Sequence, residues 1–114
     1  MIKLSPDTHA LIKLFFEDAH ERDVIGKKLE NQCGDNIYSC GDGSPESLER
    51  LRFAVLKLVN ESDQDIDYWI EIARTDWRDL FMMAGFGYDV NEHEKWKERV
   101  LTKKSSRRST AADL

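Results

Sequence analysis

Apolar residues recur at intervals of three to four positions through residues 6–33, 46–60 and 62–84. An α-helix has 3.6 residues per turn, so this spacing places the apolar side chains on one face of each helix. No segment alternates between apolar and polar residues as a half-buried strand would. The pattern therefore predicts an all-α protein.

The only two prolines occur in similar triplets, Ser5-Pro6-Asp7 and Ser44-Pro45-Glu46. A serine hydroxyl accepts hydrogen bonds from free helical N–H groups, and proline fits the first helical position because no donor is needed there. Both triplets therefore predict helix starts. The stripe from residue 6 to residue 33 leaves open whether this region is one helix or two, with Asp23 as a candidate cap for a second.

The stripe over residues 62–84 stays in phase through Thr75 and Asp76, which predicts one helix with a kink at that point. Gly85 is expected to end this helix in the left-handed conformation that glycine adopts without strain. A final helix, capped by Asp89 or Asn91, is expected to end near Leu101.

The domain organisation follows from these elements. A chain of 114 residues is long enough for one modest core. We predict a single small bundle of four to five helices over residues 1–102. Residues 103–114 are polar, small and aperiodic, which predicts a disordered basic tail.

Charge is distributed unevenly between these two parts. The tail carries four basic residues against Asp113, so the first 102 residues hold 13 basic and 21 acidic side chains, a net charge of −8. An acidic body is repelled by phosphate backbones, which disfavours a direct nucleic-acid partner. A basic protein is the better electrostatic match. A bacterial immunity protein, which neutralises a toxic nuclease, is one example of this class of acidic inhibitor.

The candidate partner-binding residues lie around the stripe that carries two of the three tryptophans. Aromatic anchors, arginines and an acidic rim are features that protein interfaces use for affinity and steering. Trp69, Trp77 and Trp96 are either core residues or interface anchors, and the phase of Trp69 and Trp77 on the stripe favours the core for these two. The candidate residues are Asp63, Asp65, Asp67, Glu71, Arg74, Asp76, Arg78 and Asp79.

An enzymatic alternative rests on two carboxylate pairs, Glu46-x-x-Glu49 and Asp76-x-x-Asp79. This pattern loosely resembles the all-α nucleotide pyrophosphohydrolases. The resemblance implies Mg²⁺ ligands on two helices, where the ions polarise a phosphoanhydride and activate water. The family's second element is Glu-x-x-Asp, whereas this chain has Asp-x-x-Asp. We therefore expect a non-enzymatic binding protein first and this hydrolase second.

The remaining candidate chemistry does not assemble into a site in the sequence. Cys33 and Cys40 lack the two-residue spacer of thioredoxin-like redox motifs and a second pair for zinc. Glu17 and His20 have the spacing of a di-iron half-site, but the second motif is absent. His93 lies between two glutamates and is read as a surface histidine. We therefore expect no metal and no cofactor.

Location and assembly are expected by default. No apolar run approaches the roughly 20 residues of a membrane span, and residues 1–7 lack a secretory apolar core. We therefore expect a cytoplasmic protein without membrane contact. It is expected to be a monomer or a homodimer, and a self-associating scaffold subunit is a third functional alternative.

Overall fold

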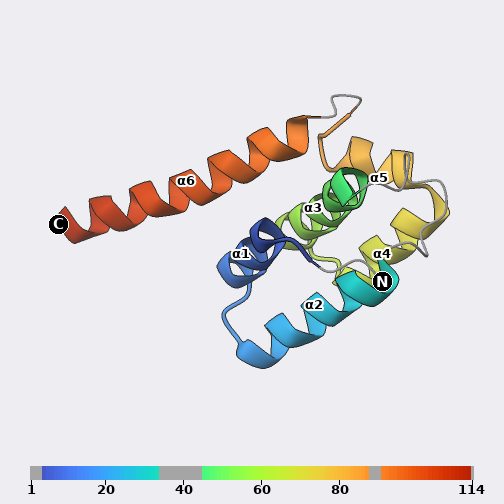
Figure 1. The fold of residues 1–114 in the computed structure, drawn as a ribbon, viewed down its shortest axis with the longest axis horizontal. Helices are drawn as coiled ribbons and strands as arrows, with labels where there is room; N and C mark the ends of the chain where they lie inside the picture. The colour runs from blue at the N-terminus through green and yellow to red at the C-terminus, as the bar shows by residue number, and fades with distance from the viewer. Residues whose placement is uncertain (1–3, 34–44, 88–90, 114) are drawn as a thin grey trace.

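The computed structural model describes the backbone of residues 4–33, 45–87 and 91–113, and side chains within residues 4–33, 48–87 and 91–102. All regular structure in these ranges is helical, so the all-α prediction is confirmed (Figure 1). The described part contains one helix more than the upper limit of the prediction. The helices are α1 (Pro6–Phe15), α2 (Ala19–Gln32), α3 (Pro45–Glu61), α4 (Ile66–Thr75), α5 (Trp77–Met83) and α6 (Glu92–Asp113).

The predicted cap at the start of α1 is present. The Ser5 hydroxyl oxygen accepts a hydrogen bond from the Thr8 backbone N–H at 3.1 Å, and Pro6 occupies the first helical position. The open question of one or two helices is settled by a break after Phe15. Asp18, rather than Asp23, caps α2 by accepting from the Glu21 N–H at 2.8 Å.

The prediction of one continuous helix over residues 62–84 is wrong, because the chain breaks at Asp76. This residue has an extended backbone (φ −155°, ψ 90°), and its N–H still donates to the Ile72 carbonyl that ends α4. Its side chain accepts from the N–H groups of Arg78 and Asp79 that begin α5. A one-residue break keeps the apolar stripe in phase, so periodicity alone did not reveal it.

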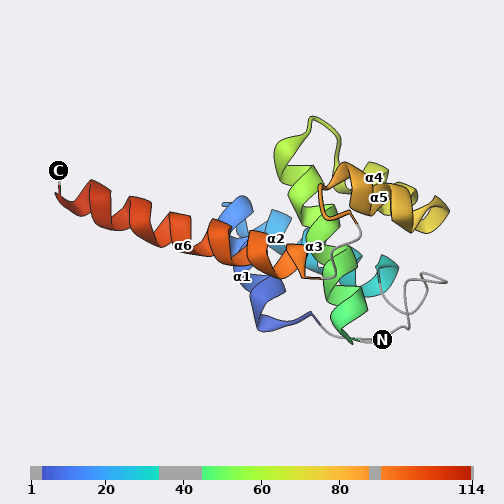
Figure 2. The same ribbon diagram turned by 90° about the horizontal axis from the view of Figure 1, so that it is seen from above.

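The core is centred on α3, which packs against α1, α4, α5 and α6 (Figure 2). A helix surrounded in this way buries side chains on most of its circumference rather than on one stripe. Five residues of α3 have no solvent exposure: Leu51, Phe53, Ala54, Val55 and Leu56. The other helices cover this centre with single apolar faces, as Leu11 of α1 and Leu29 of α2 illustrate.

The turn after α5 confirms the predicted role of Gly85. Its φ of +81° is left-handed, and the following N–H of Phe86 returns to the Phe81 carbonyl at 2.9 Å. This turn directs Phe86 into the core, where its ring centre lies 5.9 Å from that of Trp96. The α5 end and α6 are therefore joined through aromatic packing.

The last helix is longer than the sequence predicted. It starts directly after Asn91, one of the two expected caps, but it continues to Asp113 instead of ending near Leu101. The structure thus has helix where we expected a disordered tail. Residues 92–113 contain neither proline nor glycine, so nothing in them stops helix propagation once the first turns are packed. Both views show the far half of α6 projecting beyond the bundle.

Candidate functional site

The predicted partner-binding residues belong to α4, α5 and the segment that leads into them. All eight are exposed: Asp63, Asp65, Asp67, Glu71, Arg74, Asp76, Arg78 and Asp79. The apolar face of α4, including Trp69 and Ile70, is buried against the core, which turns its charged residues outward. Six acids against two arginines give this acidic face, as we call the eight residues, a net charge of −4.

Three of these acids also hold the structure together. Asp65 caps α4 through the Tyr68 N–H at 3.0 Å, and Asp76 caps α5. Asp67 accepts two bonds of 2.8 Å from the Lys28 ammonium, which joins α4 to α2. A carboxylate at a helix N-terminus is stabilised by the helix dipole. Asp65, Asp67 and Asp76 therefore stabilise the fold, whatever else the acidic face does.

A hollow of about 460 Å³ opens beside α5. It is lined by Arg50, Asp76, Trp77, Arg78, Asp79, Phe81, Met82 and Gly87, and we call it the Trp77 hollow. Three members of the acidic face thus lie on its wall. Its volume is within the range that holds a small ligand or one large side chain of a partner.

Aromatic rings and arginine side chains pack against one another in the wall of this hollow. Trp77 and Phe81 meet edge to face with ring centres 5.6 Å apart. The Arg50 guanidinium lies 4.1 Å from the centre of the Phe81 ring and donates to the Gly87 carbonyl at 2.8 Å. Arg78 lies over Trp77 at 5.3 Å. Such a wall offers apolar contact, cation–π contact and carboxylate acceptors to an incoming group.

The three tryptophans divide between core and surface. Trp69 is buried, which confirms the core interpretation for this residue, and Trp96 is buried as well. Trp69 also donates from its indole N–H to the Ser62 hydroxyl at 2.9 Å. Trp77 is only partly buried and lines the hollow. It packs against the core and also presents a surface to solvent.

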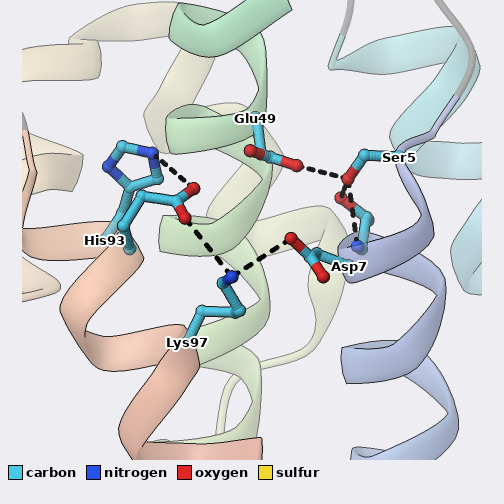
Figure 3. Close-up of polar contacts among 7 residues, drawn as sticks. Ser5, Asp7, Glu49, His93 and Lys97 are labelled. Atoms are coloured by element: carbon cyan, nitrogen blue, oxygen red, sulfur yellow. Dashed lines mark hydrogen bonds and ion pairs between the residues drawn. The ribbon is translucent and has the colours of Figure 1, made fainter.

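A second polar cluster lies where α1, α3 and α6 meet (Figure 3). Lys97 of α6 contacts Asp7 at 3.2 Å and Glu94 at 3.3 Å. Glu49 of α3 accepts a hydrogen bond from the Ser5 hydroxyl. His93 lies behind Glu94, with 3.4 Å between its Nε2 and Glu94 Oε1. Five of these six residues are ionisable, and the five come from three different helices.

Burial and crowding shift the protonation of this cluster. Burial raises the pKa of the Glu49 carboxyl, and the nearby carboxyls of Glu94 and Asp7 raise it further against the opposing Ser5 hydrogen bond. Burial alone would lower the pKa of Lys97, but its bonds to Asp7 and Glu94 outweigh this and raise it. The ammonium is therefore held charged while Glu49 holds its proton more tightly than an ordinary glutamate.

The sequence misplaced His93, which is buried and not a surface histidine. Its side chain is 6% exposed and packs against the rings of Phe53 and Phe86, at 5.6 and 6.3 Å between ring centres. Local sequence showed only the two flanking glutamates. The rings that cover His93 come from α3 and from the α5–α6 connection, so its burial depends on tertiary packing.

The residues of the hydrolase alternative occupy two places. Asp76 and Asp79 line the Trp77 hollow, whereas Glu49 contacts Ser5 and the α6 glutamate Glu94. The side chain of Glu46 lies outside the described residues. The structure therefore brings together the second carboxylate pair, and it places Glu49 with a different set of partners.

Glu17 and His20 are both exposed, as expected for a solvated surface. Cys33 is buried at the end of α2, and its carbonyl accepts from Arg52 Nε at 2.8 Å. Cys40 lies outside the described residues, so the relation between the two cysteines does too.

Within the described ranges, no helix combines the length and apolar content required to cross a membrane. Comparison of the chain with protein-family models, with curated proteins and with solved structures finds no match.

Proposed function

We propose that this protein is a non-enzymatic binding domain that takes a basic segment of another protein onto the acidic face and into the Trp77 hollow. The observation that carries the proposal is the position of this hollow. An opening lined by Trp77, Phe81 and Met82 lies among the exposed acids of α4 and α5. Aromatic and methionine anchors next to charged groups are typical of protein interfaces.

The charges around the hollow favour a basic occupant. Asp76 and Asp79 offer carboxylates at its wall, and the rest of the acidic face extends the negative surface along α4. A lysine or arginine of the partner can lie over Trp77 while pairing with these acids. Arg50 and Arg78 are engaged with Phe81 and Trp77, so the acids are the groups available to a cationic side chain.

The test is affinity capture from native lysate at low salt, about 50 mM, where exposed charges are weakly screened. Wild type is compared with the double variant Asp76→Asn, Asp79→Asn. Asparagine is as good a helix cap as aspartate, so α5 keeps its N-cap while the face loses two charges. We expect wild type to retain a basic protein that the double variant loses.

A matched control removes two charges elsewhere, with Glu17→Gln and Glu21→Gln, which are both exposed and outside the acidic face. This variant should retain the partner. Purified partner should then bind wild type with an affinity that falls as salt rises. A captured protein that is not basic, or one retained equally by the Asp76 and Asp79 variant, contradicts the proposal.

Self-association is a second candidate, favoured by exposed apolar residues on α4 and α5. Met82 and Met83 are 55% and 48% exposed, and Tyr68 of α4 is 43% exposed. A second copy of the chain covering these residues would make the protein a homodimeric scaffold subunit. Sedimentation at increasing concentration tests this, with Met82→Asp as the disrupting variant. A monomer at every concentration removes this candidate.

The hydrolase alternative stays a prediction, with Glu46, Glu49, Asp76 and Asp79 as its Mg²⁺ ligands. Calorimetric titration with Mg²⁺ in the presence of a nucleoside triphosphate tests it. The double variant Asp76→Asn, Asp79→Asn would abolish both binding and turnover if these two residues hold the ion. A flat titration of wild type removes the mechanism.

A further inference from the structure

A nitrogen ligand and two carboxylates converge at the junction of α3 and α6. Among the described residues, the group of potential metal ligands whose donor atoms approach one another within 4.8 Å consists of Glu49, His93 and Glu94. Glu49 comes from the second turn of α3, and the other two open α6. The three side chains are thus brought together only by the packing of one helix on the other.

The spacing of these atoms suits a metal ion. Two ligands that each lie about 2.1 Å from a tetrahedral ion are about 3.4 Å apart. His93 Nε2 and Glu94 Oε1 are separated by 3.4 Å. The imidazole is fixed between the rings of Phe53 and Phe86, so its position is set by the core rather than by solvent. Glu49 offers a third ligand atom, which lies within 4.8 Å of a ligand atom of each of the other two residues.

Each carboxylate has an outer partner that orients it. Ser5 donates to Glu49 Oε1, and Lys97 contacts Glu94 Oε2 at 3.3 Å. The opposite oxygen of Glu94 faces His93 Nε2, and Figure 3 shows the second Glu49 oxygen turned to the same side. Metal-binding carboxylates are usually held in this way by hydrogen bonds to their outer oxygens. Ser5 is itself fixed as the cap of α1.

The cluster has an excess of negative charge, which also favours binding of a cation. Asp7, Glu49 and Glu94 are three acids, and Lys97 contacts two of them. With a neutral imidazole the four charged groups sum to −2 when all are ionised. Glu49 and Glu94 have carboxylate oxygens within 4.8 Å of each other, so two ionised carboxylates repel here. A divalent ion between them would remove this repulsion.

We propose that Glu49, His93 and Glu94 bind one divalent first-row transition-metal ion, of which Zn²⁺ and Mn²⁺ are the probes. The mixture of one imidazole nitrogen with two carboxylate oxygens suits these ions, whereas Mg²⁺ and Ca²⁺ prefer oxygen ligands throughout. Three protein ligands leave at least one position for water. The ion would fasten the start of α6 to α3, independently of the Trp77 hollow.

The test uses the untagged full-length protein after treatment with a chelator and dialysis. Calorimetry with Zn²⁺ and with Mn²⁺ should each give one ion per chain, and Mg²⁺ and Ca²⁺ should bind at least about tenfold more weakly. Manganese is paramagnetic, so it should broaden the imidazole signals of His93 before those of His9 and His20, which are both exposed.

Two variants identify the ligands without disturbing the buried ring. Glu49→Gln keeps an oxygen for the Ser5 hydroxyl and Glu94→Gln keeps one for Lys97, and each should weaken binding by at least about tenfold. Glu98→Gln, exposed on the same helix, is the matched control and should bind as wild type does. The Asp76→Asn, Asp79→Asn protein should also bind normally, which separates this site from the hydrolase ligand set.

The proposal is overturned by three results. One is the absence of saturable binding by either ion. Another is binding that survives both glutamine variants, as it would if the ion were held by cysteine or by the exposed histidines. The third is equal broadening of all three histidines by Mn²⁺. None of these outcomes depends on the fate of the protein-binding proposal.

Discussion

The guanidinium of Arg50 lies 4.1 Å from the centre of the Phe81 ring, so a cation of α3 packs on an aromatic ring of α5 in the wall of the Trp77 hollow. The same side chain donates to the Gly87 carbonyl at 2.8 Å, just beyond the left-handed turn at Gly85. One arginine thereby holds α5 and the turn that follows it against the central helix. The shape of the Trp77 hollow depends on this contact.

Replacing Arg50 by methionine should destabilise the protein by about 1–2 kcal/mol. Methionine keeps much of the aliphatic stem but loses the cation–π contact and the bond to Gly87. Urea unfolding followed by circular dichroism measures the change. Arg99→Met is the control, because Arg99 is exposed and its contact with Glu92 at 3.4 Å should contribute less than about 0.5 kcal/mol. Equal effects of the two substitutions would contradict the assigned role.

Asp76→Ala should destabilise the protein by about 1 kcal/mol, because two N–H groups at the start of α5 lose their acceptor. Asp76→Asn should restore most of this stability, since an amide oxygen also caps a helix. Asp79→Ala, at an exposed position that caps no helix here, serves as the comparison. If alanine and asparagine at position 76 unfold at the same urea concentration, the cap contributes nothing measurable.

Trp96→Ala should cost about 3–5 kcal/mol, because the ring is 5% exposed and meets Phe15, Phe53 and Phe86. Trp77→Ala should cost less than half as much, since part of that ring already faces solvent. Thermal unfolding of both variants gives the comparison. A greater loss of stability in Trp77→Ala than in Trp96→Ala would mean that the ring on α5 contributes more to the fold than the ring on α6.

Glu49→Gln should stabilise the metal-free protein at pH 7 by about 0.5 kcal/mol, the scale of a partly exposed charge interaction. The pKa of Glu49 is raised above its ordinary 4.5, so folding favours the protonated form. Stability from this group is complete below pH 4.5 and is lost as pH rises towards the folded pKa. Glutamine removes the ionisable group, so the difference between the two proteins should vanish near pH 4. A difference that persists there would point to a cause other than charge.

Removing residues 103–114 tests the length of α6. Circular dichroism of the shortened chain should show a loss of helical signal corresponding to the residues removed up to Asp113. The free energy of unfolding should change by less than about 0.5 kcal/mol, because the far half of α6 projects beyond the bundle. An unchanged total helical signal would contradict the longer α6 and support the disordered tail that the sequence predicted.

Elements whose signals are local were predictable from the sequence. The Ser5-Pro6 start of α1, the extent of α3 and the left-handed Gly85 each depend on a few adjacent residues. The break at Asp76 was missed because it costs no change of helical phase. An aspartate can cap a helix or lie on the exposed face within one, and the sequence does not distinguish these two roles.

The candidate sites show the same division. Exposure of the acidic residues on α4 and α5 followed from the apolar stripe opposite them. Burial of His93 and its approach to Glu49 could not be predicted, because the two residues are 44 positions apart and meet only when α6 packs on α3. The two flanking glutamates suggest an exposed histidine, whereas in the folded protein Phe53 and Phe86 cover His93.

The most direct measurement of the central claim is amide hydrogen exchange of this chain with and without the basic partner recovered at low salt. Binding at the Trp77 hollow should slow exchange within residues 66–83, while α1 and α2 exchange as in the unbound protein. Protection concentrated in α1 and α2, or none in α4 and α5, would contradict the account and place the binding surface elsewhere.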